Sequence, residues 1–275
     1  MRIGFIGAGN MGGAIIKGYA GSRAMMTDKP DALFVYDSDQ AKTGSLKACG
    51  FSGGVVEKIE QLAGLCDTLV LCVKPNVMDE VLDELSGLLK AEFESKLVIS
   101  IAAGVSISYI RGKLGAGARV VRVMPNTPAM VGEGMSALSE SGGLFEGDKA
   151  AAEKIFGALG LAVWVPEEFM DTVTGISGSS PAYAYLYIEG LVRAGVLGGL
   201  SEEAATILAA QSTLGAAKMV LENLGGAAPR QLCENVCSPG GTTIEAVKVL
   251  EAEGFVETVS KAAQASAAKS KLMTR

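Results

Sequence analysis

Short apolar runs and amphipathic stretches alternate along the first part of the chain. Apolar runs bounded by polar residues are typical of strands buried in a parallel sheet. They occur at residues 3–6, 33–36, 68–73, 97–101, 119–123 and 161–165, and residues 50–57 leave a further short strand open. Amphipathic stretches at residues 11–19, 39–49, 77–89 and 106–114 predict intervening helices. This alternation predicts an α/β fold with a doubly wound parallel sheet.

The second part of the chain has only helical patterns. From Glu167 onward, amphipathic stretches predict helices at residues 182–197, 201–224, 242–252 and 255–273. Ser201 is suited to cap the second of these helices, because acidic residues follow it in the first turn. We therefore predict an α/β domain at residues 1–166 and an all-α domain at residues 167–275. Apolar residues on more than one helix face predict burial in an oligomer as well.

Three glycines follow the first predicted strand at the spacing G-x-G-x-x-G. They are Gly7, Gly9 and Gly12, and the first predicted helix begins among them. In a dinucleotide-binding turn, the first glycine permits the tight turn and the second lets the backbone approach a pyrophosphate. The third allows close packing of helix and strand, and the helix N-terminus attracts the anion. The motif predicts a Rossmann-type dinucleotide-binding domain; the alternative is an ordinary glycine-rich turn.

The second strand ends in Asp37, followed by Ser38. An acidic residue at this place usually binds the adenine ribose hydroxyls and favours NAD(H). Ser38 would instead suit a 2′-phosphate, and Asp37 has the alternative role of an N-cap for the next helix. The sequence therefore leaves NADH and NADPH both open.

Composition excludes several classes of protein and site. The chain has 275 residues, 49% of them hydrophobic, and a formal net charge of -6, so it is globular and has no basic stripe for nucleic acid. No apolar run approaches the roughly 18 residues of a membrane span, and the apolar residues at the start form a strand, not a signal peptide. There is no histidine, and Cys233 and Cys237 alone make a poor metal site.

The five cysteines lack a disulfide spacing, which predicts free thiols in a reducing cytoplasm.

Two kinds of loop offer further candidate chemistry. Loops that follow strands line the cofactor crevice of an open α/β sheet, and here they read Lys74-Pro75-Asn76, Ala102-Ala103-Gly104 and Met124-Pro125-Asn126-Thr127-Pro128. In the helical part, Ser238-Pro239-Gly240-Gly241-Thr242-Thr243 precedes a predicted helix. Converging backbone N–H groups at such a point form an anion nest. From the residues alone, an ordinary loop with an N-cap is the favoured interpretation.

The chain resembles pyrroline-5-carboxylate reductase over essentially its whole length. The resemblance is carried by GFIGAGNMG at 4–12, CVKP at 72–75, AAG at 102–104, MPNTP at 124–128, TGISGSSPAY at 174–183, LGAAKMVLE at 214–222 and SPGGTTIEA at 238–246. It implies that NAD(P)H delivers hydride to the C=N carbon of Δ1-pyrroline-5-carboxylate and gives L-proline, the last step of proline biosynthesis. A protonated imine is already an electrophile, so the absence of histidine fits this reaction.

The resemblance also implies residue roles. Ser238, Gly240, Gly241 and Thr242 would bind the substrate carboxylate, and Thr243 would hydrogen-bond the imine nitrogen, with solvent as the alternative proton source. Cofactor contacts would come from Gly7, Gly9, Asn10 and Met11 at the pyrophosphate, Asp37 and Ser38 at the ribose, and Val73, Lys74, Pro75, Ala102 and Asn126 along the nicotinamide end. The helical domain would form a homodimer whose active sites lie between subunits, and dimers would assemble further into a decamer.

Two departures and two alternatives accompany this resemblance. Ser180 stands where the family often has glycine, and Asp37 would repel a 2′-phosphate, so we expect use of both NADH and NADPH. A related two-domain imine or 3-hydroxy acid dehydrogenase would use a helical-domain lysine, here Lys218, as its acid/base. A non-catalytic nucleotide-binding sensor is the other alternative, although a sensor has no need of a carboxylate-binding loop.

Overall fold

The computed structural model describes residues 1–89, 95–140 and 142–275. The chain forms two compact units: unit 1 comprises Met1–Ser179 with Gln264–Arg275, and unit 2 comprises Ser180–Ala263. This division into compact units differs from the predicted domain boundary after residue 166, which stays a prediction.

Unit 1 is built on one eight-stranded sheet in the order β3-β2-β1-β4-β5-β6-β7-β8 among the described residues. The strands are β1 (Arg2–Ile6), β2 (Ala32–Tyr36), β3 (Gly54–Val55), β4 (Thr68–Leu71), β5 (Leu97–Ser100), β6 (Arg119–Met124), β7 (Gly134–Glu140) and β8 (Gly160–Trp164). The first six are parallel, in the strand order of a dinucleotide-binding fold, and β7 pairs antiparallel with β6. The predicted doubly wound Rossmann-type sheet is thereby confirmed.

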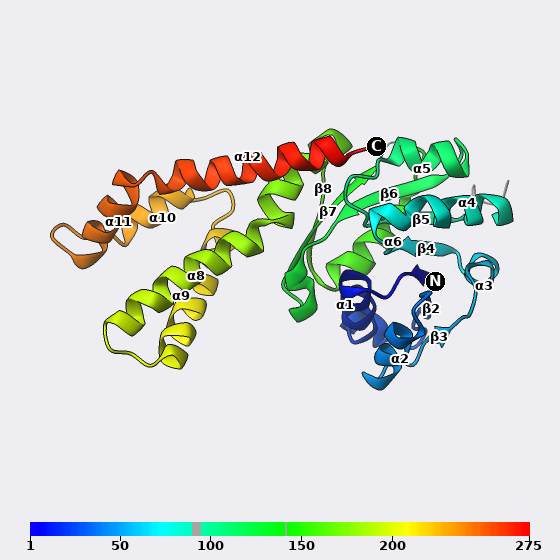
Figure 1. The fold of residues 1–275 in the computed structure, drawn as a ribbon, viewed down its shortest axis with the longest axis horizontal. Coiled ribbons are helices and arrows are strands. Elements are labelled where there is room, and N and C mark those ends of the chain that lie inside the picture. Colours follow the sequence, from blue (N-terminus) through cyan, green and yellow to red (C-terminus); the bar gives the residue numbers. More distant parts are fainter. Residues whose placement is uncertain (90–94, 141) are drawn as a thin grey trace. The chain divides into compact units, whose positions relative to one another are not determined.

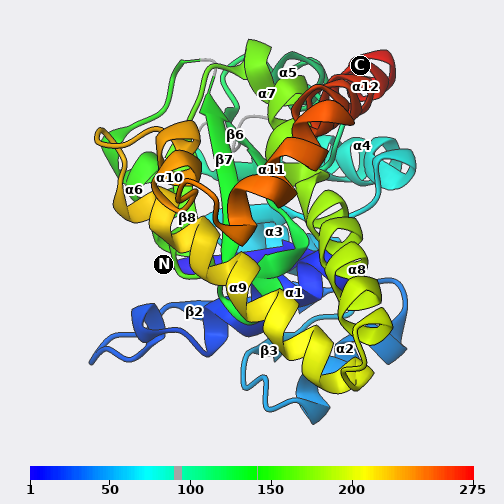
Figure 2. The ribbon, with the colours of Figure 1, turned by 90° about the vertical axis from the view of Figure 1, so that its left-hand side faces the viewer.

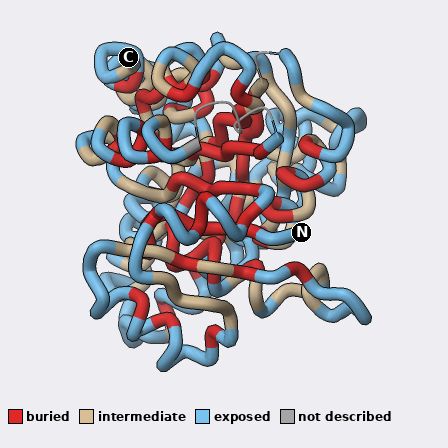
Figure 3. The backbone as a smooth tube through the Cα atoms, turned by 90° about the vertical axis from the view of Figure 1, so that its right-hand side faces the viewer, coloured by how far each residue is buried: buried red, intermediate tan, exposed pale blue. Residues whose placement is uncertain are grey.

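Helices flank both faces of this sheet (Figure 1). One face is covered by α1 (Asn10–Ala20), α2 (Gln40–Ala48) and α6 (Glu146–Gly157), and the other by α3 (Ile59–Leu65), α4 (Met78–Leu89) and α5 (Ile107–Leu114). Alternate strand residues serve the two cores: Phe5 packs with the first group and Ile6 with the second. Figure 3 shows the buried segments running through the sheet, with exposed turns around them.

A side-chain N-cap explains the start of two helices in unit 1. Asp39 caps α2 by accepting from the Ala41 N–H, and Ser106 caps α5 by accepting from the Tyr109 N–H. Unit 1 also contains α7 (Met170–Val173). Single turns occur at Arg23–Met25, Pro75–Val77, Thr127–Val131 and Glu167–Phe169, and a π-helical turn at Thr174–Gly178. The sequence pattern does not predict β7, because buried Ser136 and Ser139 interrupt its apolar residues.

The regular elements of unit 2 are all helices among its described residues, and loops join them. It contains α8 (Ser180–Leu197), α9 (Glu202–Glu222), α10 (Pro229–Asn235), α11 (Thr242–Ala252) and the first part of α12 (Phe255–Met273), whose last turns belong to unit 1. Helices α8 and α9 pack together near the turn that joins them, where a Cβ on Gly195 would lie only 2.8 Å from the Ala205 Cβ, and Figure 2 shows them diverging away from that turn. The short α10 is the helix of this unit that the sequence pattern does not predict.

Helix α9 corrects one expectation about apolar length. It is the one helix in the described ranges that is long and apolar enough, by length and composition alone, to cross a membrane. Its acidic residues lie at its two ends and Lys218 is the one charged residue between them, so the weakly polar stretch is longer than the periodicity indicates. Only 11% of the 18-residue window is buried. The apolar surface of α9 therefore lacks a cover within the described chain.

Candidate functional site

The glycine loop after β1 has the geometry of a dinucleotide-binding turn. Gly7 has φ +102°, and a Cβ there would lie 2.9 Å from the Cys72 backbone. A Cβ on Gly12 would lie 2.4 Å from the Gly7 carbonyl oxygen, so helix α1 can approach β1 only with glycine here. A Cβ on Gly9 would meet nothing within 4 Å. Gly7 and Gly12 are thus required by the fold, whereas Gly9 leaves open space above the loop.

Helix α1 begins at this loop with its N-terminal N–H groups available. Its N-cap is Gly9, which supplies no side-chain cap, and its first turn carries no acidic residue. The free N–H groups and the helix dipole favour an anion at this point. The open space above Gly9 and this helix end together fit a pyrophosphate, so the residues present suit a bound NAD(P)H.

Asp37 holds the glycine loop against the end of β2. Its carboxylate accepts hydrogen bonds from the Ala8 N–H at 2.7 Å and the Asp39 N–H at 2.8 Å, and Lys42 Nζ lies 3.3 Å away. Burial opposes ionisation, but these donors outweigh it and keep the pKa of Asp37 below its ordinary value. Asp37 does not cap α2, because Asp39 does so. The ionised Asp37 is therefore already engaged by the protein.

Two adjoining cavities of about 470 Å³ each lie over the loop and the carboxyl ends of β1, β4 and β5. Both are lined by Gly9, Lys42, Cys72, Val73 and Lys74. One extends to Gly7, Asp37 and Ser38, and the other to Asn10, Met11, Pro75 and Ala102. Apart from Asn126, the structure thus brings the predicted cofactor residues together, while the contact of each with the cofactor stays a prediction.

Asn126 lies outside the lining of these two cavities. Its side-chain amide donates to the Ser177 carbonyl oxygen at 3.1 Å, and its amide oxygen accepts from the Met135 N–H at 2.9 Å. Both contacts hold the Met124–Pro128 loop against its neighbours. Asn126 therefore has a structural role in unit 1, beside its predicted place near the nicotinamide.

The sequence interpretation missed Lys42 as a site residue. Lys42 lies in the first turn of α2 and lines both cavities as well as a third one over α1. Its position five residues after Asp37 was the available signal, since the first turn of this helix faces the ribose end. Cys72 also lines both cavities, but burial raises its pKa to about 12, so it is a neutral thiol near pH 7 and not a nucleophile.

The predicted substrate loop lies in unit 2, before α11. Gly240 has φ +69°, and the Gly241 N–H donates to the Ser238 carbonyl oxygen at 3.0 Å. A Cβ on Gly241 would lie 2.3 Å from Ser238 Oγ, a contact that rotation of this hydroxyl relieves, so the position in this turn that favours glycine is Gly240 with its positive φ. Gly241 is also the N-cap of α11 and provides no side-chain cap. The N–H groups of Thr242 and Thr243 are the first in the helix and suit a carboxylate.

Comparison with known proteins covers both parts of the chain. Residues 167–273 match the family model described as pyrroline-5-carboxylate reductase dimerisation, and residues 2–104 match NADP oxidoreductase coenzyme F420-dependent. The chain is 39% identical to pyrroline-5-carboxylate reductase of Escherichia coli over 274 residues, covering 100% of this chain and 98% of that protein. It is 41% identical to the enzyme of Methanosarcina acetivorans, covering 96% of each chain.

A solved structure gives the same relationship. Plasmodium falciparum pyrroline carboxylate reductase with NADP bound matches with a TM-score of 0.84 and 33% identity, covering 100% of this chain and 98% of that one. The chain belongs to the pyrroline-5-carboxylate reductase family. The family resemblance inferred from the sequence motifs is confirmed, as is the assignment of the chain as an oxidoreductase.

Membership of the pyrroline-5-carboxylate reductase family explains the two-part architecture. The dimerisation match covers α8 to α12, so these helices form a dimerisation region. The NADP oxidoreductase match covers β1 to β5 and therefore the glycine loop with most of the residues that line its two cavities. NAD(P)H is accordingly the cofactor of this reductase, and the two parts supply its binding and its assembly.

Proposed function

We propose that this chain reduces Δ1-pyrroline-5-carboxylate to L-proline with NAD(P)H, the last step of proline biosynthesis. The observation that carries the proposal is its relationship to pyrroline-5-carboxylate reductases over the full length of both proteins. The glycine loop with open space above Gly9 supports it independently, since it suits a dinucleotide.

The reaction depends more on the alignment of cofactor and substrate than on acid–base catalysis by the protein. When bound, NAD(P)H supplies the hydride that adds to the C=N carbon of the protonated imine, and the positive charge is lost as the new C–H bond forms. No oxyanion develops, so the chain needs no oxyanion hole or metal for this step. Its residues hold the cofactor, bind the substrate carboxylate and bring the two reacting carbons together.

The Ser238–Thr243 loop is the proposed substrate site. The N–H groups at the start of α11 and the hydroxyls of Ser238 and Thr242 suit a carboxylate. Thr243 then lies next along the helix, where its hydroxyl would hydrogen-bond the imine nitrogen. Because a hydroxyl is a weak acid, the proton comes through Thr243 or from solvent.

Both forms of the cofactor are proposed as substrates. Asp37 is engaged by the Ala8 N–H and by Lys42, so its negative charge at the ribose end is partly offset. Ser38 and Lys42 line the same cavity and suit a 2′-phosphate, because one offers a hydroxyl and the other a cation. This arrangement supports use of NADPH as well as NADH.

The assembly we propose is a homodimer through α8 to α12, with dimers associating into a decamer in the cytoplasm. Exposed apolar side chains on α9, such as Leu214 and Leu208, support a second copy as the cover of this helix. In the proposed dimer, the nucleotide site of one subunit faces the Ser238–Thr243 loop of its partner. A second copy also accounts for the apolar length of α9 without a membrane.

A steady-state assay of the purified chain tests the function. Δ1-Pyrroline-5-carboxylate is supplied once with NADH and once with NADPH, and both nicotinamide absorbance and proline are measured. The proposal expects equal amounts of cofactor oxidised and proline formed with each. A folded protein that binds NADPH but turns over no substrate would contradict it and would favour the nucleotide-sensor alternative.

A further inference from the structure

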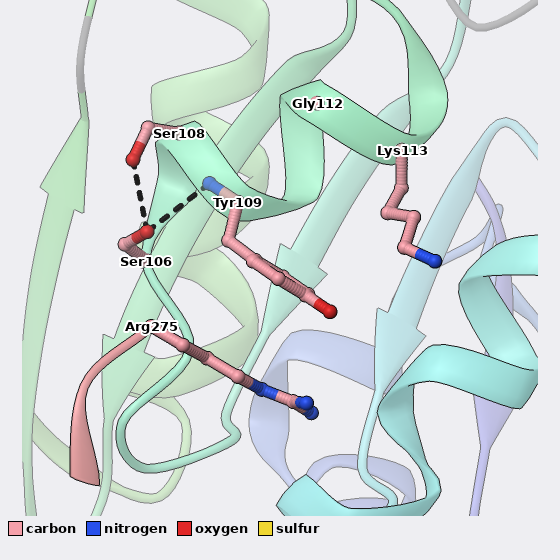
Figure 4. A pocket seen from close by; sticks show the side chains of 6 residues that line it. All are labelled: Ser106, Ser108, Tyr109, Gly112, Lys113 and Arg275. Atoms are coloured by element: carbon pink, nitrogen blue, oxygen red, sulfur yellow. Dashed lines mark hydrogen bonds between the residues drawn. The ribbon is translucent and has the colours of Figure 1, made fainter.

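A shallow depression of about 410 Å³ lies on unit 1 beside α5. Ser106, Ser108, Tyr109, Gly112, Lys113 and Arg275 line it (Figure 4). Both of its cations are already paired, Lys113 with Asp83 and Arg275 with Asp79, each at 2.7 Å. The depression is therefore a poor anion site. Its Arg275 side chain instead makes several contacts with other parts of unit 1.

The Arg275 side chain joins three elements of unit 1. Its guanidinium donates to Asp79 Oδ2 at 2.7 Å and to the Pro75 carbonyl oxygen at 2.5 Å. It also stacks on Tyr109, 4.8 Å from the ring centroid, and the Tyr109 hydroxyl donates to the other Asp79 oxygen. In Figure 4 the side chain runs alongside the Tyr109 ring. The forked guanidinium thus ties the start of α4, the loop before it and α5 together.

The Arg275 backbone holds a second loop. Its N–H donates to the Gly104 carbonyl oxygen, and its own carbonyl oxygen accepts from the Ser106 N–H, both at 3.0 Å. Gly104 has φ +71°, and a Cβ there would lie 2.9 Å from the Met273 carbonyl oxygen. The loop after β5 is therefore shaped to receive the segment that ends in Arg275.

This segment is itself fixed to unit 1. Ser270 Oγ donates to Asp171 Oδ1 at 2.6 Å, and Thr274 Oγ1 donates to the same oxygen at 3.1 Å. Asp171 belongs to α7, so the last turn of α12 is anchored before the chain reaches the two loops. The backbone that carries Arg275 is consequently held in place on unit 1.

The two loops held by Arg275 line one end of the cofactor cavities. Pro75 comes from the loop after β4, and Ala102 and Ala103 come from the loop after β5. We propose that Arg275 is a positioning residue for the cofactor, because it locks these two loops in the spacing that the nicotinamide end requires. The inference rests on the proposed nicotinamide site but needs no particular imine substrate.

Binding of NADPH to the full-length protein tests the inference without turnover. The Kd is measured by NADPH fluorescence for wild type, Arg275→Ala and Arg275→Lys, with the melting temperature measured in parallel. Arg275→Ala is expected to raise the Kd about fivefold, because it removes several hydrogen bonds of modest individual strength. Arg275→Lys keeps the cation near Asp79 but loses the fork, so an intermediate Kd is expected.

Lys113→Ala is the matched control. It removes an ion pair between the same two helices, α4 and α5. The partner of Lys113 in this pair is Asp83, which belongs to neither cofactor loop. We expect its Kd for NADPH to equal that of wild type. With pyrroline-5-carboxylate, Arg275→Ala should raise the KM for NADPH while leaving the KM for the imine within about twofold.

A wild-type Kd in Arg275→Ala, whether or not its melting temperature falls, would overturn the inference and leave Arg275 with a purely structural role. If Arg275→Ala does not fold, the Kd of Arg275→Lys against Lys113→Ala decides in the same way. Failure of the proposed function would look different. Wild type would then bind NADPH without reducing the imine, and the comparison of Kd values would still stand.

Discussion

The two units of this chain use their apolar residues in opposite ways. Unit 1 places them in two enclosed cores, one on each face of its sheet. In unit 2, the buried apolar side chains among the described residues are Ala205 and Ala209, while Ile207 and Leu214 are 61% and 53% exposed. Unit 1 therefore buries its apolar residues within its own fold. Unit 2 leaves an apolar surface exposed, which a further protein surface would have to cover.

This difference explains how the work of the enzyme is divided. A site that must hold a dinucleotide needs a rigid sheet, and unit 1 provides it with its own packing. A helical unit with an open apolar face depends on a second copy, which is what a dimerisation region provides.

Leu214→Glu should abolish the dimer. Leu214 lies seven residues from Ile207 and from Leu221, so the three share one face of α9, and all three are exposed in the single chain. A glutamate there would be buried without a partner in the dimer, and activity should fall by about a hundredfold or more. Light scattering in detergent-free buffer should report a monomer.

The control for Leu214→Glu is Met26→Glu. Met26 is 76% exposed in a loop of unit 1, so the same kind of change should leave mass and activity unaltered. NADPH binding should survive in both variants, because unit 1 packs independently. A dimeric, active Leu214→Glu protein would contradict the comparison, and wild-type protein that needs detergent to stay in solution would favour a membrane as the cover of α9.

Substitutions at Gly9 and Gly7 should distinguish a loss of cofactor binding from a loss of stability in unit 1. Gly9→Val adds its side chain to open space, so the melting temperature should hold while the Kd for NADPH rises about tenfold or more. Gly7→Val forces a branched residue to φ +102° against the Cys72 backbone, which should cost about 3 kcal/mol or more. Thermal melting and NADPH titration of both variants check this. Equal loss of stability in the two would refute the assigned roles.

Asp31 should make the stability of unit 1 sensitive to acid. Its carboxylate, 4% exposed, accepts from Lys154 Nζ at 2.6 Å, from the Met1 amino group at 2.7 Å and from the Tyr19 hydroxyl at 2.5 Å. Burial alone would raise the pKa of Asp31, but these donors together keep it below its ordinary value of 3.8. Its contribution is thus complete above about pH 4 and is lost as pH falls through the lowered pKa.

Asp31→Asn should therefore lower the melting temperature at pH 7 by about 4 to 8 °C, or about 2 kcal/mol, because it leaves Lys154 without its partner. The loss is moderate since Lys154 is 37% exposed. The difference from wild type should shrink as pH falls toward 3. A gap that stays constant with pH would show that the ionised carboxylate is not the stabilising group.

Lys218→Ala should have the smallest effect. Lys218 is the acid/base candidate of the related hydroxy-acid dehydrogenases, whereas the proposed imine reduction does not use it. The kcat with pyrroline-5-carboxylate should change by less than about twofold, and Thr243→Val should lower it more. Complete loss of turnover in Lys218→Ala, with the dimer intact, would favour the alternative chemistry.

Sequence reasoning predicted most of unit 1 because its signals are local. The apolar runs and the G-x-G-x-x-G spacing report buried strands and a turn that only glycine can make, as the geometry of Gly7 bears out. It missed β7, whose buried Ser136 and Ser139 hide the strand pattern. It also missed Lys42, although its position five residues after Asp37 was a signal for the ribose end of the cavities that Lys42 lines.

The contacts that could not be predicted from the sequence are those between residues far apart in the chain. Asp37 was expected at the ribose, and its hydrogen bond to the Ala8 N–H crosses 29 positions that no motif connects. Arg275 meets the Pro75 carbonyl oxygen 200 positions away. No periodicity or spacing reports such pairs, because they arise from the tertiary packing of separate elements.

The most direct test of the account is complementation between two defective subunits. Gly9→Val weakens cofactor binding about tenfold or more, and Gly240→Val forces a branched residue to φ +69° in the substrate loop. At NADPH well below the Kd of Gly9→Val, each protein alone should have about a tenth of wild-type activity or less. If unit 1 of one subunit works with unit 2 of its partner, a random mixture of co-expressed subunits should recover about a quarter of wild-type activity, since mixed dimers hold one intact site. Mixed dimers that form and yet show no activity above the parents would contradict a site shared between subunits.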